Sequence, residues 1–291
     1  MKIFDLHSDI LYDLYKHYPK VKERFCEYHL PRLKISPVRG GIWALYSPND
    51  FALPEAVEKA LSGIDRNALE DFDLVFGLEG LRNLQIEDFD RLYDLGFRHA
   101  SLTWNEENIY ATGVRGPKSR GLTSLGKKLL SKMVEHEMII DLSHLNEKSF
   151  DDVLDYTNKN IIFSHGNIRE ICNHPRNLSR RQLLRLKEAD GLLGLSLVRY
   201  FISAKPEEQN VNTFLSHLDA AVEIMGIDNL AFGFDFMDYF NDENSNLDEI
   251  PDSTRLGVLL DALKQKGYSD EDIEKISYRN FYDRFHHLIW R

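Results

Sequence analysis

The sequence predicts an α/β fold, a (β/α)8 or TIM barrel in which parallel strands alternate with helices. Two observations predict it. Short apolar, β-leaning runs recur eight times over roughly 230 residues, and helical patterns separate most of them. Histidines and acidic residues follow several of these runs directly, at the strand ends where barrels of this kind place their active sites. Such barrels typically contain about 250 residues, and the chain has 291.

The expected elements follow one another along the whole chain. Strands are predicted at 2–6, 41–46, 73–78, 98–103, 138–142, 160–164, 191–196 and 230–234. Helices are predicted between them at 54–70, 86–95, 122–136, 146–157, 179–189 and 211–226, and afterwards at 253–266, 269–276 and 278–289. The polar, acidic stretch 237–252 is expected to be a long loop.

Several helices carry recognisable ends. Thr123 or Ser124 can cap the helix that begins "TSLGKKLL", and Ser179 can cap a later helix. Helices are expected to stop at three glycines, Gly96, Gly226 and Gly267.

An open, doubly wound sheet is the alternative fold, because eight short strands are easily miscounted. No Gly-x-Gly-x-x-Gly follows the first strand, so the dinucleotide-binding version of that fold has no support. We therefore expect residues 1–291 to form a single barrel domain with C-terminal helices.

Composition narrows the possible partners and surroundings. The net charge is −11 and no basic cluster stands out, which argues against nucleic acid as a partner. Cys26 and Cys172 show no pairing motif, so two reduced thiols are expected. The N-terminus does not resemble a signal peptide, and no run approaches the ~18–20 apolar residues of a membrane span. A cytoplasmic location, away from membranes, is the simplest expectation.

Six chemically active side chains lie where predicted strands end. They are His7, Asp9, Glu79, His144, His165 and Asp235. In a parallel barrel these strand ends converge on one mouth. Residues two apart on a strand share a face, so His7 and Asp9 can bind one ion together. Imidazole and carboxylate groups suit Zn²⁺ and similar metals, and this many ligands suits two ions that share a bridging carboxylate.

Each signal alone has a simpler explanation. Asp9 could cap the following helix, and Glu79 before Gly80 could be a turn residue. The other histidines, His99 among them, are expected to be surface or core residues without a role in the site. The hypothesis depends on all six residues meeting at the same edge of the barrel.

With these residues in place, the chain resembles the renal or membrane dipeptidase family, peptidase family M19, a branch of the amidohydrolase-type metal barrels. The resemblance covers most of the chain and is carried by several motifs in the right order. They are "DLHSD", "GLEG", "GLTSLGKKLL", "IIDLSH", "IIFSH", "CNHPRNLS" and "GFDF". Together the motifs are highly specific, although each alone is weak.

The resemblance implies a role for each residue. Two Zn²⁺ ions per chain are implied, one bound by His7 and Asp9 and the other by His144 and His165, with Glu79 bridging both. A metal-bridging hydroxide would attack the peptide bond while Asp235 handles protons. Arg176 would bind the terminal carboxylate of the substrate, although by itself it reads as a surface ion pair. Asp5 can support His7 or make a buried structural hydrogen bond.

The sequence departs from the family pattern at two positions. Trp104 stands where the family commonly has a histidine that binds substrate and stabilises the tetrahedral intermediate. Trp has one indole donor and no titratable group, so Asn105 or Asn108 is a candidate for a polar contact with substrate nearby. Met237 stands where a second Asp is often seen.

The resulting hypothesis is a zinc metallodipeptidase that hydrolyses small dipeptides, including those with a C-terminal D-residue. One alternative keeps the metals and changes the substrate to another amide, a lactam or a lactone, because of Trp104. Another is an inactive barrel that serves as a binding protein. The family resemblance also implies a homodimer.

Overall fold

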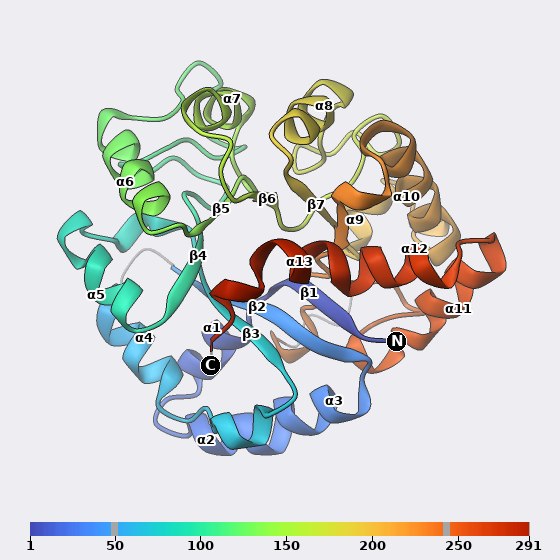
Figure 1. The fold of residues 1–291 in the computed structure, drawn as a ribbon, viewed down its shortest axis with the longest axis horizontal. Coiled ribbons are helices and arrows are strands. Elements are labelled where there is room, and N and C mark those ends of the chain that lie inside the picture. The colour runs from blue at the N-terminus through green and yellow to red at the C-terminus, as the bar shows by residue number, and fades with distance from the viewer. Residues whose placement is uncertain (48–51, 241–244, 291) are drawn as a thin grey trace.

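The computed structural model describes residues 1–47, 52–240 and 245–290, and its centre is a closed barrel of eight parallel strands (Figure 1). The strands pair in chain order: β1 (Ile3–Ser8), β2 (Val38–Tyr46), β3 (Asp73–Glu79), β4 (Phe97–Ser101), β5 (Ile139–Asp141), β6 (Ile161–Phe163), β7 (Leu192–Leu195) and β8 (Leu230–Phe232). The direct pairing of β1 with β8, where Asp5 lies opposite Phe232, closes the barrel. The predicted (β/α)8 fold is therefore confirmed, and the open-sheet alternative is wrong.

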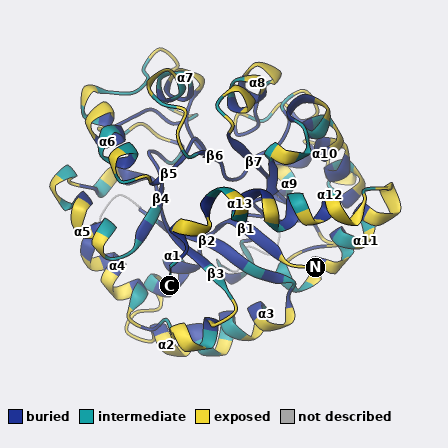
Figure 2. Cartoon of the chain, viewed as in Figure 1, coloured by how far each residue is buried: buried dark blue, intermediate teal, exposed yellow. Residues whose placement is uncertain are grey.

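Helices surround the barrel, and Figure 2 shows buried strands inside helices that keep exposed outer faces. They are α1 (Ile10–Lys16), α2 (Val21–Arg24), α3 (Leu30–Ile35), α4 (Leu53–Leu61), α5 (Phe89–Asp94), α6 (Ser124–Glu135), α7 (Glu147–Tyr156), α8 (Arg180–Glu188), α9 (Arg199–Ile202), α10 (Val211–Met225), α11 (Gly257–Lys266), α12 (Asp270–Glu274) and α13 (Asn280–Phe285). Among the described residues, no helix is both long and apolar enough to cross a membrane.

The predicted helix ends are confirmed. Thr123 caps α6, because its hydroxyl accepts a hydrogen bond from the Gly126 N–H at 3.0 Å. Ser179 forms a reciprocal capping box with Gln182 at the start of α8. Backbone φ is positive at the three glycines expected to end helices, at 100° in Gly96, 83° in Gly226 and 101° in Gly267.

Several segments differ from the prediction, and one of them is α9, between β7 and β8, where no helix was expected. Three short helices, α1 to α3, fill the connection between β1 and β2, where no helix was expected; a π-helical turn at 25–29 interrupts them, so no long helical periodicity develops. The helix predicted at 54–70 is divided into α4 and a 3₁₀ turn, Arg66–Leu69. Gly63 lies in the break, and a Cβ there would be 2.3 Å from the Lys22 backbone nitrogen. Close approach of two backbones therefore overrides the helical pattern.

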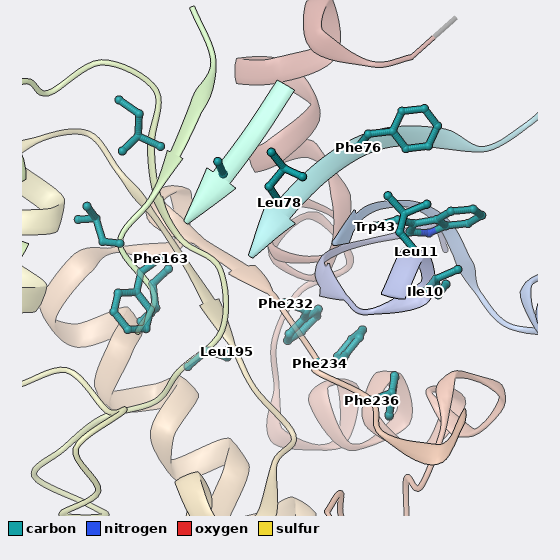
Figure 3. Packing of buried hydrophobic residues seen from close by; sticks show 14 of the residues in the cluster. Ile10, Leu11, Trp43, Phe76, Leu78, Phe163, Leu195, Phe232, Phe234 and Phe236 are labelled. Atoms are coloured by element: carbon teal, nitrogen blue, oxygen red, sulfur yellow. The ribbon is translucent and has the colours of Figure 1, made fainter. Parts of the chain in front are cut away.

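Apolar side chains pack on both sides of the strands. Outside, the strands and helices share one large cluster that includes Trp43, Phe76 and Phe232 (Figure 3). Inside, a smaller cluster fills the N-terminal half of the barrel with Phe4, Leu6, Ile42, Val75, Ile139, Ile162, Leu192 and Ala231. Helix α13 closes this end: it lies across the strands in Figure 1, and the Phe281 ring stacks on the Phe4 ring with centroids 3.8 Å apart. The opposite, C-terminal half of the interior is left for polar side chains.

Candidate metal centre

The six side chains singled out in the sequence meet at the C-terminal mouth of the barrel, and all are buried. Glu79 lies at the centre of the histidines. Its Oε1 is 2.7 Å from His144 Nε2 and 3.8 Å from the Nε2 atoms of both His7 and His165. A carboxylate that reaches all three rings occupies the position that a bridging ligand requires.

Two acids complete the cluster around His7. Its Nε2 is 4.0 Å from Asp9 Oδ1 and 3.9 Å from Asp235 Oδ1. The possible ligand atoms of His7, Asp9 and Asp235 all lie within 4.8 Å of one another, and so do those of His7, Glu79 and His165. Donor atoms at this spacing can surround metal ions of the kind that histidine and carboxylate ligands select.

The simpler explanations for two of these acids do not fit. Asp9 precedes α1 at the N-cap position, but its side chain makes no capping hydrogen bond. Glu79 is the last residue of β3 and is only 4% exposed, whereas a turn residue would face solvent. Both carboxylates therefore point into the mouth.

The backbone is strained at two residues of the cluster. His144 has a φ of 70° and Asp235 a φ of 58°, a left-handed conformation that non-glycine residues rarely adopt. Such strain persists where the surrounding structure enforces it, typically at functional sites. His144 follows β5 and Asp235 follows β8, and both line the cavity at the mouth.

Hydrogen bonds define which ring nitrogen of His144 is free. Asn105 Oδ1 accepts from His144 Nδ1 at 3.1 Å, so in the neutral ring Nε2 carries no hydrogen. This bare nitrogen faces His165 Nε2 at 3.0 Å and Glu79 Oε1 at 2.7 Å. The lone pair of His144 Nε2 therefore points toward the lone pairs of neighbouring ligand atoms, an arrangement that a bound cation would stabilise.

Burial favours the neutral form of all six side chains of the cluster. It raises the pKa of Asp235 to about 7, raises the pKa of Glu79 and raises that of Asp9 well above its usual value. It lowers the pKa of all three histidines. Asp9 Oδ1 and His7 Nδ1 are buried without a hydrogen-bond partner among the described residues. Neutral imidazoles, clustered carboxylates and an unpaired carboxylate oxygen fit a site for divalent metal ions.

Arg176 is buried beside the cluster, at 6% exposure, and the surface ion-pair explanation is wrong. Within the described ranges no carboxylate pairs with it; Nη2 donates to the His165 carbonyl at 3.3 Å, and Nε has no partner. Burial lowers its pKa to about 10, so the guanidinium is charged at neutral pH. It lines a cavity of about 200 Å³ together with five members of the cluster, all except His7.

The residues expected near the Trp104 position have different surroundings. The Trp104 ring lies between Tyr46 and His144, with centroids 5.4 and 6.1 Å away, and it lines the same cavity as Met237. Asn105 also lines this cavity, and its side-chain oxygen contacts His144. Asn108 instead holds its own loop, because its side chain bonds to backbone groups of Leu102, Tyr110 and Ala111.

Three buried polar residues beneath the cluster were not singled out in the sequence as site residues: His99, Asp141 and Ser164. His99, expected to have no role in the site, bonds to Asp141, and Asp141 bonds to Ser164 beside His165. Asp141 and Ser164 stand inside the motifs "IIDLSH" and "IIFSH", three residues before His144 and one before His165, and that nearness is the signal that could have found them. Asp5 accepts from the backbone N–H groups of His7 and Phe234, which is the structural alternative foreseen for it.

The fold and this cluster define a barrel of the metal-dependent hydrolase class. Within that class, the chain belongs to the membrane dipeptidase family, peptidase family M19, whose sequence model matches residues 66–284.

Curated relatives agree with this assignment. An uncharacterized protein in the pqqA 5′ region of Klebsiella pneumoniae is 31% identical over 203 residues, or 67% of this chain and 73% of that protein. An uncharacterized dipeptidase of Schizosaccharomyces pombe is 29% identical over 246 residues, 81% of this chain and 58% of that protein. The dipeptidase tcpJ of Claviceps purpurea is 30% identical over 69% of this chain and 48% of that protein. The chain thus spans about half the length of the two named dipeptidases.

Solved structures share the fold. A metallopeptidase from Rhodobacter sphaeroides, liganded with a phosphinate mimic of the dipeptide L-Ala-D-Ala, superposes with a TM-score of 0.85 at 22% identity, covering 100% of this chain and 99% of that one. The dipeptidase AC, a metallopeptidase of family M19, gives a TM-score of 0.84 at 24% identity, covering 99% of each chain.

Proposed function

We propose that this protein is a zinc-dependent dipeptidase. The observation that carries the proposal is a buried arginine without a carboxylate partner in the described chain, lining one small cavity with a histidine–carboxylate cluster. A free guanidinium recognises a carboxylate with paired hydrogen bonds. A cavity of about 200 Å³ suits a substrate no larger than two residues.

The proposed metal ligands are those of the sequence hypothesis: His7 and Asp9 for one zinc ion, His144 and His165 for the other. Glu79 would bridge the two ions, which its central position supports. When bound, the ions would supply an activated bridging water as nucleophile and polarise the scissile carbonyl.

Asp235 is the proposed proton-transfer group. It lines the cavity, and its pKa is raised to about 7 by burial and by the nearby Glu79 carboxylate. A carboxylate in this position can take a proton from the attacking water and deliver it to the leaving amine.

Arg176 would hold the C-terminal carboxylate of the dipeptide and thereby limit substrate length. We extend the proposal to dipeptides with a C-terminal D-residue because the R. sphaeroides relative is liganded with a mimic of L-Ala-D-Ala. We further propose a homodimer, a cytoplasmic location and a single domain over 1–291.

Trp104 favours a second candidate, a metal-dependent hydrolase of another amide, a lactam or a lactone. Its ring lines the cavity beside His144, and it offers one indole N–H and no titratable group. Stabilisation of the tetrahedral intermediate then falls to other donors, and those donors would select the substrate.

The test is metal content by elemental analysis beside hydrolysis of L-L and L-D dipeptides. Near two zinc ions per chain with dipeptide turnover would support the proposal. Two zinc ions without turnover would favour the second candidate. Protein purified with zinc present that still contains no metal would refute both, and would favour the inactive barrel.

A further inference from the structure

A polar layer lies inside the barrel directly beneath the candidate metal centre. It consists of His99 on β4, Asp141 on β5 and Ser164 immediately after β6, three adjacent strands in Figure 1. None of the three is more than 1% exposed. Buried polar groups of this kind need defined hydrogen-bond partners, so the directions of their hydrogen bonds can be worked out.

The Asp141 carboxylate accepts hydrogen bonds from every side. Oδ1 accepts from the backbone N–H groups of Ser143 at 2.9 Å and Ser164 at 3.0 Å. Oδ2 lies 2.5 Å from Ser164 Oγ and 3.2 Å from His99 Nε2. Burial alone would raise the pKa of Asp141, but these hydrogen bonds, led by the one from His99, hold the pKa below its usual value. As an ionised acceptor, Asp141 must receive the hydrogen of the Ser164 hydroxyl.

The direction of the Ser164–Asp141 hydrogen bond determines the direction of the bond between Ser164 and His165. A serine hydroxyl has a single hydrogen, and that of Ser164 points to Asp141. Ser164 Oγ also lies 2.7 Å from His165 Nδ1 and 3.1 Å from Ser143 Oγ, so Ser164 accepts in both contacts and the ring nitrogen must donate. A neutral imidazole that carries its hydrogen on Nδ1 has a bare Nε2. His165 Nε2 lies inside the cluster, 3.0 Å from His144 Nε2 and 3.8 Å from Glu79 Oε1.

We propose that the His99–Asp141–Ser164 chain is a positioning device that fixes the tautomer and ring orientation of His165, leaving Nε2 free to bind metal. His99 donates a hydrogen bond to Asp141 Oδ2. Ser164 donates its hydroxyl hydrogen to Asp141 and accepts the ring hydrogen of His165 Nδ1. The inference rests on the proposed function insofar as His165 is taken to be a metal ligand. The tautomer itself is a property of the chain without metal.

Three glycines make room for this layer. A Cβ on Gly77 would lie 2.5 Å from His99 Nδ1. A Cβ on Gly194 or Gly233 would lie 1.9 or 1.7 Å from the Ser164 carbonyl oxygen. Neighbouring strands therefore leave out side chains where His99 and Ser164 sit, so the layer is accommodated by the barrel on several sides.

Asp141→Asn provides the sharpest test because it replaces the carboxylate oxygen that accepts from Ser164 with an NH₂ group that donates, with little change in volume. The amide oxygen can keep the two backbone hydrogen bonds, which places the NH₂ group against Ser164 Oγ. Ser164 would then donate to His165 Nδ1, and the ring hydrogen would move to Nε2. Asp5→Asn is the matched control, since Asp5 is another buried acid that accepts two backbone N–H groups, without contact to a ligand ring.

Two measurements read the effect. Histidine ring ¹⁵N NMR of the metal-free proteins should give the Nδ1–H form of His165 in wild type and Asp5→Asn, and the Nε2–H form in Asp141→Asn. Zinc affinity, measured by competition with a chelator, should fall about 10–100-fold in Asp141→Asn and stay near wild type in the control. Ser164→Ala removes the link and should also lower zinc affinity, which keeps the test available if Asp141→Asn does not fold.

The outcomes separate the two proposals. An unchanged His165 tautomer in folded Asp141→Asn, or wild-type zinc affinity in Ser164→Ala, would overturn the positioning role. A wild type that binds no zinc would overturn the proposed function instead, and the NMR comparison would still decide the tautomer.

Discussion

The N-terminal and C-terminal halves of the barrel interior lie on the same strands, but the first is apolar and the second is lined by acids and histidines. On β3, Val75 packs in the apolar inner cluster, Gly77 adjoins His99, and Glu79 reaches the mouth. Each is two residues from the next, as expected for side chains on one face of a strand. Four residues along a strand thus separate a hydrophobic core from a cluster of acids and histidines.

The comparison teaches how the fold separates stability from chemistry. The N-terminal half buries apolar area and is closed by Phe281 and its neighbours, which favours folding. The C-terminal half buries carboxylates whose pKa values are raised, a sign of unfavourable charge burial. Bound cations would remove that penalty, so loss of metal should affect one half and loss of packing the other.

The largest expected effect comes from the centre of the polar half. Glu79→Ala should lower bound metal and reduce turnover by about 10³-fold, because several kcal/mol of transition-state stabilisation by the ions would be lost. Elemental analysis and dipeptide hydrolysis check this. Two tight ions with full activity in the variant would show that the bridging role is wrong.

The corresponding change in the apolar half is Phe281→Ala. Removal of a buried ring that stacks on Phe4 should lower the free energy of unfolding by about 3–5 kcal/mol. Denaturant unfolding measures the loss, and the metal content of the folded variant should equal that of wild type. A folded variant with less bound metal would contradict the idea that packing in the apolar half is independent of metal binding in the polar half.

Arg176→Ala should chiefly weaken binding of dipeptides with a free carboxylate. Loss of one partner of a buried charge pair costs about 2–5 kcal/mol, so KM should rise by at least about 30-fold. A C-terminally amidated substrate is the control and should be affected much less. Equal losses on both substrates would contradict the assignment.

The last expected effect is a pH dependence of the metal-free protein. Burial raises the pKa of Asp5 to about 8 from 3.8, so folded protein keeps a proton that unfolded chain releases above about pH 4. The contribution of Asp5 to stability is therefore complete below that pH and is lost as the pH rises to about 8. Asp5→Asn keeps the backbone hydrogen bonds and removes the titration. Urea unfolding of both proteins should show a stability difference that changes over this range; a constant difference would refute the raised pKa.

Much of this architecture could be predicted from the sequence because its signals are local. Apolar runs predict the strands, and His165 can be identified as a candidate because it follows one of these runs closely. The contacts between strands could not be predicted, because they depend on the register of neighbours. The register of β4 and β5 places Ser101 opposite Asp141 and His99 opposite Ile139, so the His99 ring meets Asp141 diagonally across the two strands. The role of Asn105 beside His144 likewise depends on how a loop folds back over the mouth.

The closure of the barrel by α13 has a consequence for the order of synthesis. The residues that cover the inner apolar cluster, Phe281 and Phe285, leave the ribosome after all eight strands. Until then Phe4 and its neighbours have no cover, however complete the strand pairing. Folding of the nascent chain should therefore finish late. A ribosome stalled just after β8 should carry a barrel whose inner apolar cluster is exposed, and chaperones bind exposed apolar surface of this kind.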